Sequence, residues 1–259
     1  MQNPLDRAMP SAIRISVIIP CFNSADVIED TLRSVFAQRF AAEEVLVYND
    51  ASSDETMTVL AACQTRWPGL KVFSDDLNRG AGYARRYLLK QATGSHVAFL
   101  DADDIWLPEK LEIQAQLIQR ENVDLVVSAY RIVDRAGSFL GARKPKSNFG
   151  YRDMLMTNWI PMSTVLASRS LKGIAEMPLM RRRQDYAYWL MIFRRNPNLK
   201  LAVHPDPLMI YRRASGSLSS NMLENLRSNY QVFRQEEQFS AIASIMLLGL
   251  NMMFRVFRR

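Results

Sequence analysis

Three aspartates stand within four positions of the chain, directly after a short apolar run. Asp101, Asp103 and Asp104 follow residues 96–100, whose composition is typical of a buried strand. Carboxylates this close repel one another unless a positive group lies between them. Alternate side chains can point at one ion, and oxygen ligands suit Mg²⁺ or Mn²⁺ that is shared with substrate phosphates. The sequence therefore indicates a divalent-metal site, with a solvated turn before a helix at Pro108 as the alternative.

The pattern of apolar residues places this cluster at the edge of a sheet. Strands are expected over residues 15–20, 44–48, 70–74, 96–100 and 124–134, and helices over 25–38, 54–65, 81–91, 108–120 and 186–195. Alternating strands and helices require a mostly parallel sheet, which binds ligands beyond the carboxyl ends of its strands. Residues 21–23 and Asn49-Asp50 should therefore meet Asp101 along one rim. The first strand is not followed by Gly-x-Gly-x-x-Gly, so the dinucleotide fingerprint is excluded.

Length and composition are those of an ordinary globular domain. The chain has 259 residues, of which 48% are hydrophobic and 23% charged, and this balance excludes disorder, collagen and coiled coil for the whole chain. Two cysteines are too few for a disulfide framework and fit a reducing compartment. The first fourteen residues lack the apolar segment of a secretory signal, so a cytoplasmic location is expected.

The net charge of +7 is concentrated in the C-terminal part, which has 13 Lys and Arg against 5 Asp and Glu from residue 181 onward. This excess indicates either a solvated basic face or contact with an anionic partner. The apolar segment 241–254 is shorter than the about 20 helical residues that span a bilayer. It could form an interfacial helix with Arg255, Arg258 and Arg259 at lipid headgroups. The alternatives are packing on its own domain or on a second subunit.

An ordered series of motifs resembles the family 2 glycosyltransferases, of GT-A fold, over roughly residues 14–221. The matching segments are residues 16–23, 34–38, 45–54, 78–80 with 84–85, 99–106, 108–111, 184–190, and 211–213 with 217–221. Each segment alone is weak, but their order is specific. The resemblance implies one α/β, Rossmann-like domain with a mostly parallel central sheet flanked by helices. We expect a nucleotide-sugar-binding half (1–135), an acceptor and catalytic half (136–221), and a helical, amphipathic, basic tail (222–259).

The resemblance assigns the donor site to the ends of the first strands. Asp50 matches an aspartate that accepts a hydrogen bond from the uracil ring, and a carboxylate suits a ring N–H. Asn49 replaces the first member of the more usual Asp-Asp pair. Pro20 and Phe22 match residues that line the nucleoside slot. Turn formation for Asp50 and core packing for Phe22 are the alternatives. The other expected donor-binding residues are Asn23, Gly80, Asp101 and Ala102.

The resemblance also implies a metal site and a catalytic base. Asp101 and Asp103 match the Asp-x-Asp motif, in which Asp103 is expected to contact Mn²⁺ or Mg²⁺ directly and Asp101 to contact the metal or the ribose. His204 is a further candidate ligand, with a structural histidine at a strand end as the alternative. Asp185 matches the base that deprotonates the acceptor hydroxyl, although glutamine precedes it where glutamate is common. A helix N-terminal acid beside residues 181–183 is the alternative.

The implied function is metal-dependent, inverting transfer of a hexose or N-acetylhexosamine from a UDP-sugar to a hydroxyl of a glycan or lipid-linked acceptor. Such a reaction belongs to cell-surface polysaccharide biosynthesis. The alternatives are a non-catalytic sugar-nucleotide-binding or scaffold protein and a polyprenyl-phosphate sugar transferase. No nucleic-acid partner is expected, because a nucleic-acid-binding protein would not need the acidic rim and the sequence contains no recognisable RNA- or DNA-binding module. An anionic membrane surface on the inner face of the plasma membrane and an oligomer are further candidate partners.

Overall fold

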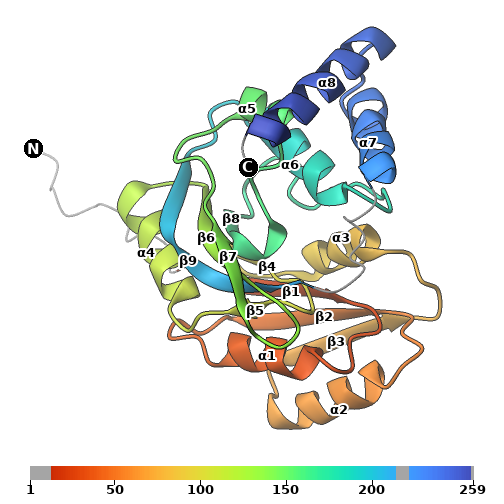
Figure 1. The fold of residues 1–259 in the computed structure, drawn as a ribbon. Helices are drawn as coiled ribbons and strands as arrows, with labels where there is room; N and C mark the ends of the chain where they lie inside the picture. The colour runs from red at the N-terminus through yellow and green to blue at the C-terminus, as the bar shows by residue number, and fades with distance from the viewer. Residues whose placement is uncertain (1–12, 214–221, 258–259) are drawn as a thin grey trace, which may run out of the picture.

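The computed structural model describes residues 13–213 and 222–257. Its centre is a curved sheet of nine strands (Figure 1). Three of the segments discussed above lie outside the described residues. They are the N-terminal segment up to residue 12, the motif at 217–221, and Arg258 with Arg259. The strand order is β3-β2-β1-β4-β8-β6-β9-β5, and β7 pairs with β6.

The strands and helices alternate along the first half of the chain, as expected. The strands are β1 (Ile15–Cys21), β2 (Glu44–Asp50), β3 (Leu70–Asp75), β4 (His96–Phe99), β5 (Ile105–Trp106), β6 (Leu125–Val133), β7 (Phe139–Arg143), β8 (Val165–Ser168) and β9 (Leu201–Arg212). The helices are α1 (Ile28–Phe36), α2 (Thr56–Arg66), α3 (Ala81–Gln91), α4 (Lys110–Glu121), α5 (Tyr151–Met156), η1 (Met162–Thr164), α6 (Gln184–Arg195), α7 (Met222–Gln231), η2 (Val232–Glu236) and α8 (Ala241–Phe257). The predicted strands and helices up to β6 are confirmed, with boundary shifts of a few residues.

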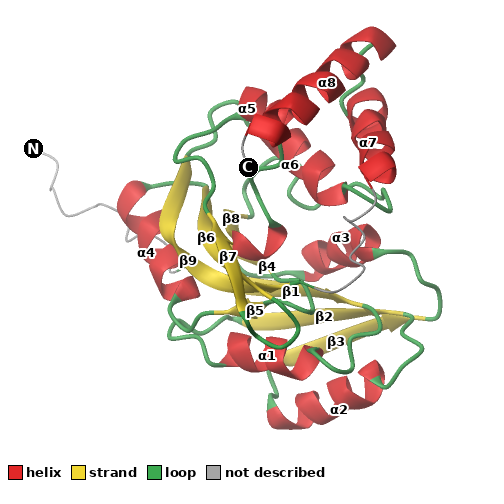
Figure 2. Ribbon diagram, in the orientation of Figure 1, coloured by secondary structure: helices red, strands yellow, loops and turns green. Residues whose placement is uncertain are grey.

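The first four strands form the parallel part of the sheet. β1 pairs in parallel with β2 and β4, and β2 pairs in parallel with β3. Every residue of β1 and β2 is buried, because helices cover both faces of this part of the sheet. α3 covers one face of these strands and α1 the other (Figure 2). Ile18 and Leu46 belong to the same core cluster as Leu88 of α3, and Val17 belongs to the same cluster as Leu32 of α1. These strands carry the rim on which the candidate residues stand.

The remaining strands make the sheet mixed. β8 lies antiparallel between β4 and β6, β9 is parallel to β6, and β5 is antiparallel to β9. The sequence predicts a strand end at His204, but β9 continues through Pro205 and Pro207, which cannot donate to a ladder. The structure accommodates them through register shifts on either side of Ala129 in β6. β9 then continues to Arg212 and reaches the acidic loop.

Helices α5 to α8 form a group over one face of the sheet (Figure 1). All eight residues from Tyr186 to Phe193 of α6 are buried, so this helix is central to the group. α8 contacts α5, α7 and η2. Among the described helices, none combines the length and the apolar character needed to span a bilayer.

Candidate active site

The loops that follow β1 and β2 are joined at the rim, as the sequence predicts. The backbone N–H of Ser53 donates to Asn23 Oδ1 at 2.8 Å, and the Asn23 N–H donates to Ser52 Oγ at 2.9 Å. Pro20 is buried within β1, whereas the Phe22 side chain is 48% exposed. A large aromatic ring left exposed at a strand end is available to a ligand, which is the role expected for Phe22 and not that of a core residue.

Asp50 shapes the loop that leads into α3. Its Oδ1 accepts the backbone N–H of Arg79 at 2.8 Å, and its Oδ2 accepts the N–H of Gly80 at 2.7 Å. The Asn78 side chain donates to the Asp50 carbonyl at 3.1 Å. Gly80 has a φ of +87°, a conformation that glycine adopts without steric cost. Asp50 is 2% exposed, so a bond from a nucleobase would use the remaining lone pairs of the same two oxygens.

The start of α3 lies against the loop that precedes α6. A Cβ atom on Gly82 would lie 2.6 Å from the Pro178 carbonyl oxygen and 3.6 Å from the Gln184 Cβ. This approach joins α3 to the segment that carries Asp185, the residue after Gln184. Sequence reasoning does not reveal the contact, because a glycine in a first helical turn is also explained by turn formation.

We expect Gly82→Ala to lower kcat about 100-fold, because the added methyl group must displace the Pro178 backbone and with it Asp185. The matched control is Gly69→Ala, where a Cβ meets no atom within 4 Å and φ is not positive. Steady-state sugar transfer with both variants measures the effect. Equal rates for Gly82→Ala and the control would contradict a role for this contact.

A buried arginine pairs with one carboxylate of the acidic cluster. Arg85 on α3 is 5% exposed, and its Nη2 forms an ion pair with Asp101 Oδ1. Among the described residues, the Nε and Nη1 atoms of Arg85 have no hydrogen-bond partner. Arg85 is therefore the positive group that the sequence required but did not identify. Arg85 thereby occupies one oxygen of Asp101.

The other two aspartates are shifted toward their neutral forms. Burial, followed by the Asp101 charge, raises the pKa of Asp103, and the guanidinium groups of Arg212 and Arg85 offset part of this effect. Asp104 is fully buried, and burial together with the charges of Asp101 and Asp103 raises its pKa well above the ordinary value. A cation at Asp103 would remove the repulsion that raises its pKa.

Ser163 holds the acidic loop in place from the neighbouring η1 turn. Its Oγ accepts the backbone N–H of Asp101 at 3.0 Å and donates to Asp104 Oδ2 at 2.5 Å. Its carbonyl accepts the indole N–H of Trp106 at 2.9 Å. Ala102, between the two motif aspartates, is buried. Asp104 thus stabilises the turn, and Ser163 is a positioning residue to which the sequence assigned no role.

The end of β9 closes the other side of the acidic loop. Arg212 Nε donates to the Asp103 carbonyl at 2.6 Å, and its Nη2 donates to the Val27 carbonyl at 3.3 Å. Burial and the charges of the nearby aspartates, Asp104 first, raise the pKa of Tyr211 to about 12. The first part of the motif at residues 211–213 is therefore beside the metal candidates.

His204 is not brought to these carboxylates. It lies inside β9, opposite Ser128 of β6, and its Nδ1 is 3.2 Å from the carbonyl oxygen of Asp206. Within the described ranges, no three His, Cys, Asp or Glu side chains form a group that could hold a metal ion. The structural role for His204 fits this placement, although the residue is inside a strand and not at its end. Asp101 and Asp103 still fit Mg²⁺ or Mn²⁺, which often uses one or two protein carboxylates with substrate phosphates.

Asp185 stands in the first turn of α6. Asn158 Nδ2 donates to its Oδ2 at 2.8 Å and so fixes the orientation of the carboxylate. Arg183, immediately before the helix, has a φ of +59°, which turns the chain sharply into α6. The sequence did not single out Asn158, because an asparagine 27 positions away has no local relation to Asp185.

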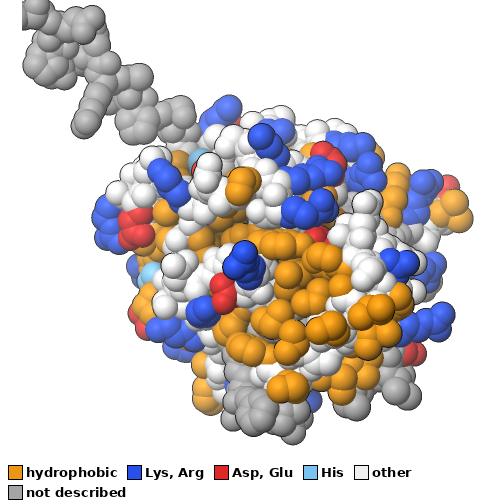
Figure 3. All heavy atoms as spheres, turned by 90° about the horizontal axis from the view of Figure 1, so that it is seen from above, with side chains coloured by type: hydrophobic (Ala, Val, Ile, Leu, Met, Phe, Trp, Pro, Cys, Tyr) orange, Lys and Arg blue, Asp and Glu red, His pale blue; other side chains and the backbone are white. Residues whose placement is uncertain are grey.

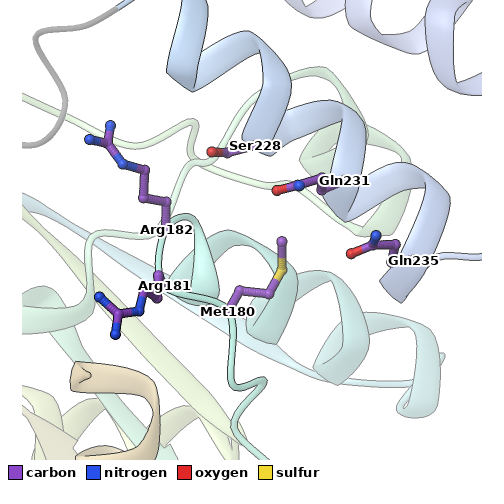
Figure 4. A pocket seen from close by; sticks show the side chains of 6 residues that line it. All are labelled: Met180, Arg181, Arg182, Ser228, Gln231 and Gln235. Carbon is purple, nitrogen blue, oxygen red and sulfur yellow. The ribbon is translucent and has the colours of Figure 1, made fainter. Parts of the chain in front are cut away.

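A pocket of about 260 Å³ opens beside the start of α6 (Figure 4). Arg181 and Arg182 extend from the loop before α6, and polar side chains of α7 and η2 lie opposite. The lining residues are Met180, Arg181, Arg182, Ser228, Gln231 and Gln235. Arg182 also forms an ion pair with Glu224. Guanidinium and amide groups of this kind bind phosphate and sugar oxygens well.

Known proteins with similar sequences are bacterial glycosyltransferases. The family model described as glycosyl transferase family 2 matches residues 16–201. The chain is 32% identical over 226 residues to the putative teichuronic acid biosynthesis glycosyltransferase TuaG of Bacillus subtilis, with 86% of this chain and 88% of TuaG covered. It is 32% identical over 219 residues to the UDP-Glc:alpha-D-GlcNAc-diphosphoundecaprenol beta-1,3-glucosyltransferase WfgD of Escherichia coli, with 84% of each chain covered.

Solved structures share the fold at lower identity. S. aureus TarS in complex with UDP-GlcNAc has a TM-score of 0.68 and 22% identity, covering 91% of this chain and 70% of that chain. The mannosyltransferase PcManGT from Pyrobaculum calidifontis, in complex with GDP-Man and Mn²⁺, has a TM-score of 0.66 and 19% identity, covering 93% of this chain and 74% of that chain. At these identities the structures show the fold alone. Together with the sequence matches, they establish that the chain belongs to glycosyl transferase family 2 and has the GT-A fold.

Proposed function

We propose that this glycosyltransferase moves a hexose or N-acetylhexosamine from a UDP-sugar to a hydroxyl of a glycan or lipid-linked acceptor, with inversion at the anomeric carbon. The observation that carries the proposal is the contact of Gly82 with the Pro178 carbonyl. This contact brings the helix that follows the Asp50 loop next to the segment that carries Asp185. This proximity supports assigning the donor-binding and base candidates to one site in a member of a glycosyltransferase family.

Asp50 and Phe22 are the proposed readers of the nucleoside. Uracil presents a ring N–H between two carbonyls, and the remaining lone pairs of the Asp50 carboxylate suit that donor. The exposed ring of Phe22 offers a face to the base or ribose. UDP is favoured because WfgD is named for UDP-Glc and TarS was solved with UDP-GlcNAc. The GDP-Man complex of PcManGT makes guanosine diphosphate the nucleotide to test against it.

Asp103, with the free oxygen of Asp101, is the proposed holder of Mn²⁺ or Mg²⁺. A bound divalent ion supplies positive charge where the departing diphosphate gains negative charge. Arg85 forms an ion pair with Asp101 beside it, and Ser163 fixes the backbone of the loop. The Mn²⁺ in the PcManGT complex is consistent with this assignment.

Asp185 is the proposed general base. One of its oxygens takes the proton of the acceptor hydroxyl while the hydroxyl oxygen bonds to the anomeric carbon. The bond from that carbon to the diphosphate oxygen breaks on the opposite face, so the anomeric configuration inverts and UDP leaves. Asn158 holds the second oxygen and keeps the carboxylate directed. The transition state has positive charge on the sugar ring, as in other glycosyl reactions.

The pocket between the Arg181-Arg182 loop and α7 is the proposed acceptor side. Arg181 can bind an acceptor diphosphate there, and Gln231 and Gln235 can bind sugar hydroxyls. WfgD, as its name states, acts on GlcNAc-diphosphoundecaprenol, which is the chemistry proposed for this acceptor. Such an acceptor would place the enzyme at the inner face of the plasma membrane.

The test is release of UDP from a panel of UDP-sugars, with GDP-Man as the other nucleotide, in the presence of Mn²⁺. We expect slow hydrolysis of one UDP-sugar without acceptor and faster turnover with a synthetic GlcNAc-diphosphate lipid. Turnover of GDP-Man alone would overturn the donor assignment. Turnover with polyprenyl phosphate in place of the saccharide acceptor would instead establish a polyprenyl-phosphate transferase. Binding of UDP with no turnover of any donor and acceptor would identify a binding protein.

A further inference from the structure

Helix α8 has polar residues on the side that faces the domain and large apolar residues on the exposed side, which is the opposite of an ordinary surface helix. Its buried positions include two polar residues, Ser244 at 0% and Asn251 at 3% exposure. Asn229 of α7 donates to Asn251 Oδ1 at 3.4 Å, and Asn251 Nδ2 donates to the Leu155 carbonyl at 3.5 Å. The helix is therefore attached to the domain by polar contacts, with Leu247 as a partly buried apolar contact. Phe254 also makes an edge contact with the Trp159 ring, and most of the other large apolar residues of α8 are left for the opposite side.

The outward side of α8 is a continuous apolar surface. Spacings of three and four residues place five exposed side chains along one side of the helix, namely Ile242 (75% exposed), Ile245 (61%), Met246 (64%), Leu250 (44%) and Met253 (57%). Met252 and Phe254, each 39% exposed, flank this stripe on either side. Figure 3 shows hydrophobic side chains gathered in a broad patch on this face of the molecule, with Lys and Arg at its border. Soluble proteins rarely leave such a patch in water without a partner.

Charge favours an anionic partner. The last acidic residue of the chain is Glu237, and the 22 residues after it contain three arginines and no acid. The elements that contact α8 carry exposed arginines, namely Arg152 on α5, Arg227 on α7 and Arg234 on η2, but each also carries one acidic residue, so the positive excess comes from the segment after Glu237. An apolar helix bordered by arginines is complementary to an anionic lipid surface. A second copy would bring two basic borders together, so charge disfavours a dimer through this face.

We propose that α8 lies flat on an anionic phospholipid bilayer, with its apolar side in the headgroup and acyl boundary and the surrounding arginines at the phosphates. A helix of 17 residues is about 25 Å long, which suits lying in the interface. α7 both contacts α8 and contributes Ser228 to the pocket beside α6. Docking through α8 therefore brings that pocket close to the bilayer. The docking itself does not depend on the proposed sugar transfer.

The test is flotation of the full chain with vesicles. One vesicle contains phosphatidylethanolamine and phosphatidylglycerol in equal parts, and the other contains phosphatidylcholine alone. We expect wild-type protein to float with the anionic vesicle, less with the neutral one, and less at high salt. Ile245→Glu/Met246→Glu should bind at least about tenfold more weakly. Phe139→Glu, which changes an apolar residue on β7 that is 66% exposed, should bind like wild type.

Folding of the variants is checked by circular dichroism, and Ile245→Ala/Met246→Ala provides a milder change with a smaller expected loss. Equal flotation of the glutamate variant and wild type would overturn the proposal. A wild-type dimer that the glutamate variant converts to monomer, without vesicle binding by either, would assign the face to a second copy instead. Hydrolysis of the UDP-sugar in solution should be the same in wild type and variant. Its absence from both, with flotation intact, would refute the proposed function and leave the docking unaffected.

Discussion

Asp185→Asn is expected to lower kcat by about 10²–10⁴-fold while UDP binding stays at the wild-type value. The amide keeps the size of the side chain and can still contact Asn158, so the start of α6 should remain folded. It cannot accept the proton of the acceptor hydroxyl, so the attacking oxygen remains a weak nucleophile. Steady-state transfer to acceptor measures kcat, and calorimetric titration with UDP and Mn²⁺ measures binding.

Asp206→Asn is the matched control, because it makes the same change at an exposed position of β9. Asp206→Asn should leave both kcat and the affinity for UDP unchanged. A near-normal kcat for Asp185→Asn would remove the base assignment and leave this carboxylate as a helix N-terminal residue beside three arginines. Loss of UDP binding in the same variant would instead show that Asp185 supports the donor site.

Asp103→Ala should abolish the dependence of UDP binding on Mn²⁺. Loss of a residue that merely supports a metal ligand weakens metal affinity by about 10–100-fold, so loss of a direct ligand should exceed that range. The metal needs the carboxylate form, and the pKa of Asp103 is raised by burial and by Asp101. In wild type, metal-dependent binding should therefore weaken as the pH falls, and begin to do so at a higher pH than for an ordinary aspartate.

UDP titrations with and without Mn²⁺, repeated over a pH series, measure both effects. Asp76→Ala removes an exposed carboxylate from the loop after β3 and is the matched control. Unchanged Mn²⁺-dependent affinity in Asp103→Ala would assign the metal elsewhere. The pH series tests the effect of burial separately. If Mn²⁺-dependent UDP binding by the wild type weakens only at the pH where an ordinary aspartate is protonated, burial has no effect on this site.

The parallel half of the sheet was predictable because its strands are short runs rich in apolar residues, of which β1 and β2 are fully buried, and because segments with helical spacing separate them. Of the mixed half, β6 was predicted, whereas the pairing and extent of the strands around it were not. β9 contains prolines that indicate a loop, and only its pairing with a shifted β6 makes it a strand. β8 has four residues, too few to carry a periodicity. From the sequence, the acidic rim and the Asp185 helix could therefore be located, but not the strands that fasten one to the other.

Within the site, residues that carry a local motif were predicted and residues that act at long range were not. Asp101 and Asp103 can be recognised by their Asp-x-Asp spacing after an apolar strand, and the structure places them together in one loop. Arg85 is followed by a second arginine on a helix, so the sequence could not show that Arg85 is buried against Asp101. Ser163 contacts a loop about sixty positions earlier, which no spacing rule connects. His204 had a suitable residue type, but strand pairing determined its surroundings.

The two backbone hydrogen bonds that Asp50 accepts from Arg79 and Gly80 have a consequence for donor affinity. A flexible loop at this edge would lose conformational entropy on each binding event, and that loss would weaken the net affinity for the donor. Here the loop is already ordered by the carboxylate at the end of β2, before a nucleotide arrives. A donor that binds at this edge, as we propose, would meet a preorganised surface, and its binding free energy would not be spent on arranging the main chain.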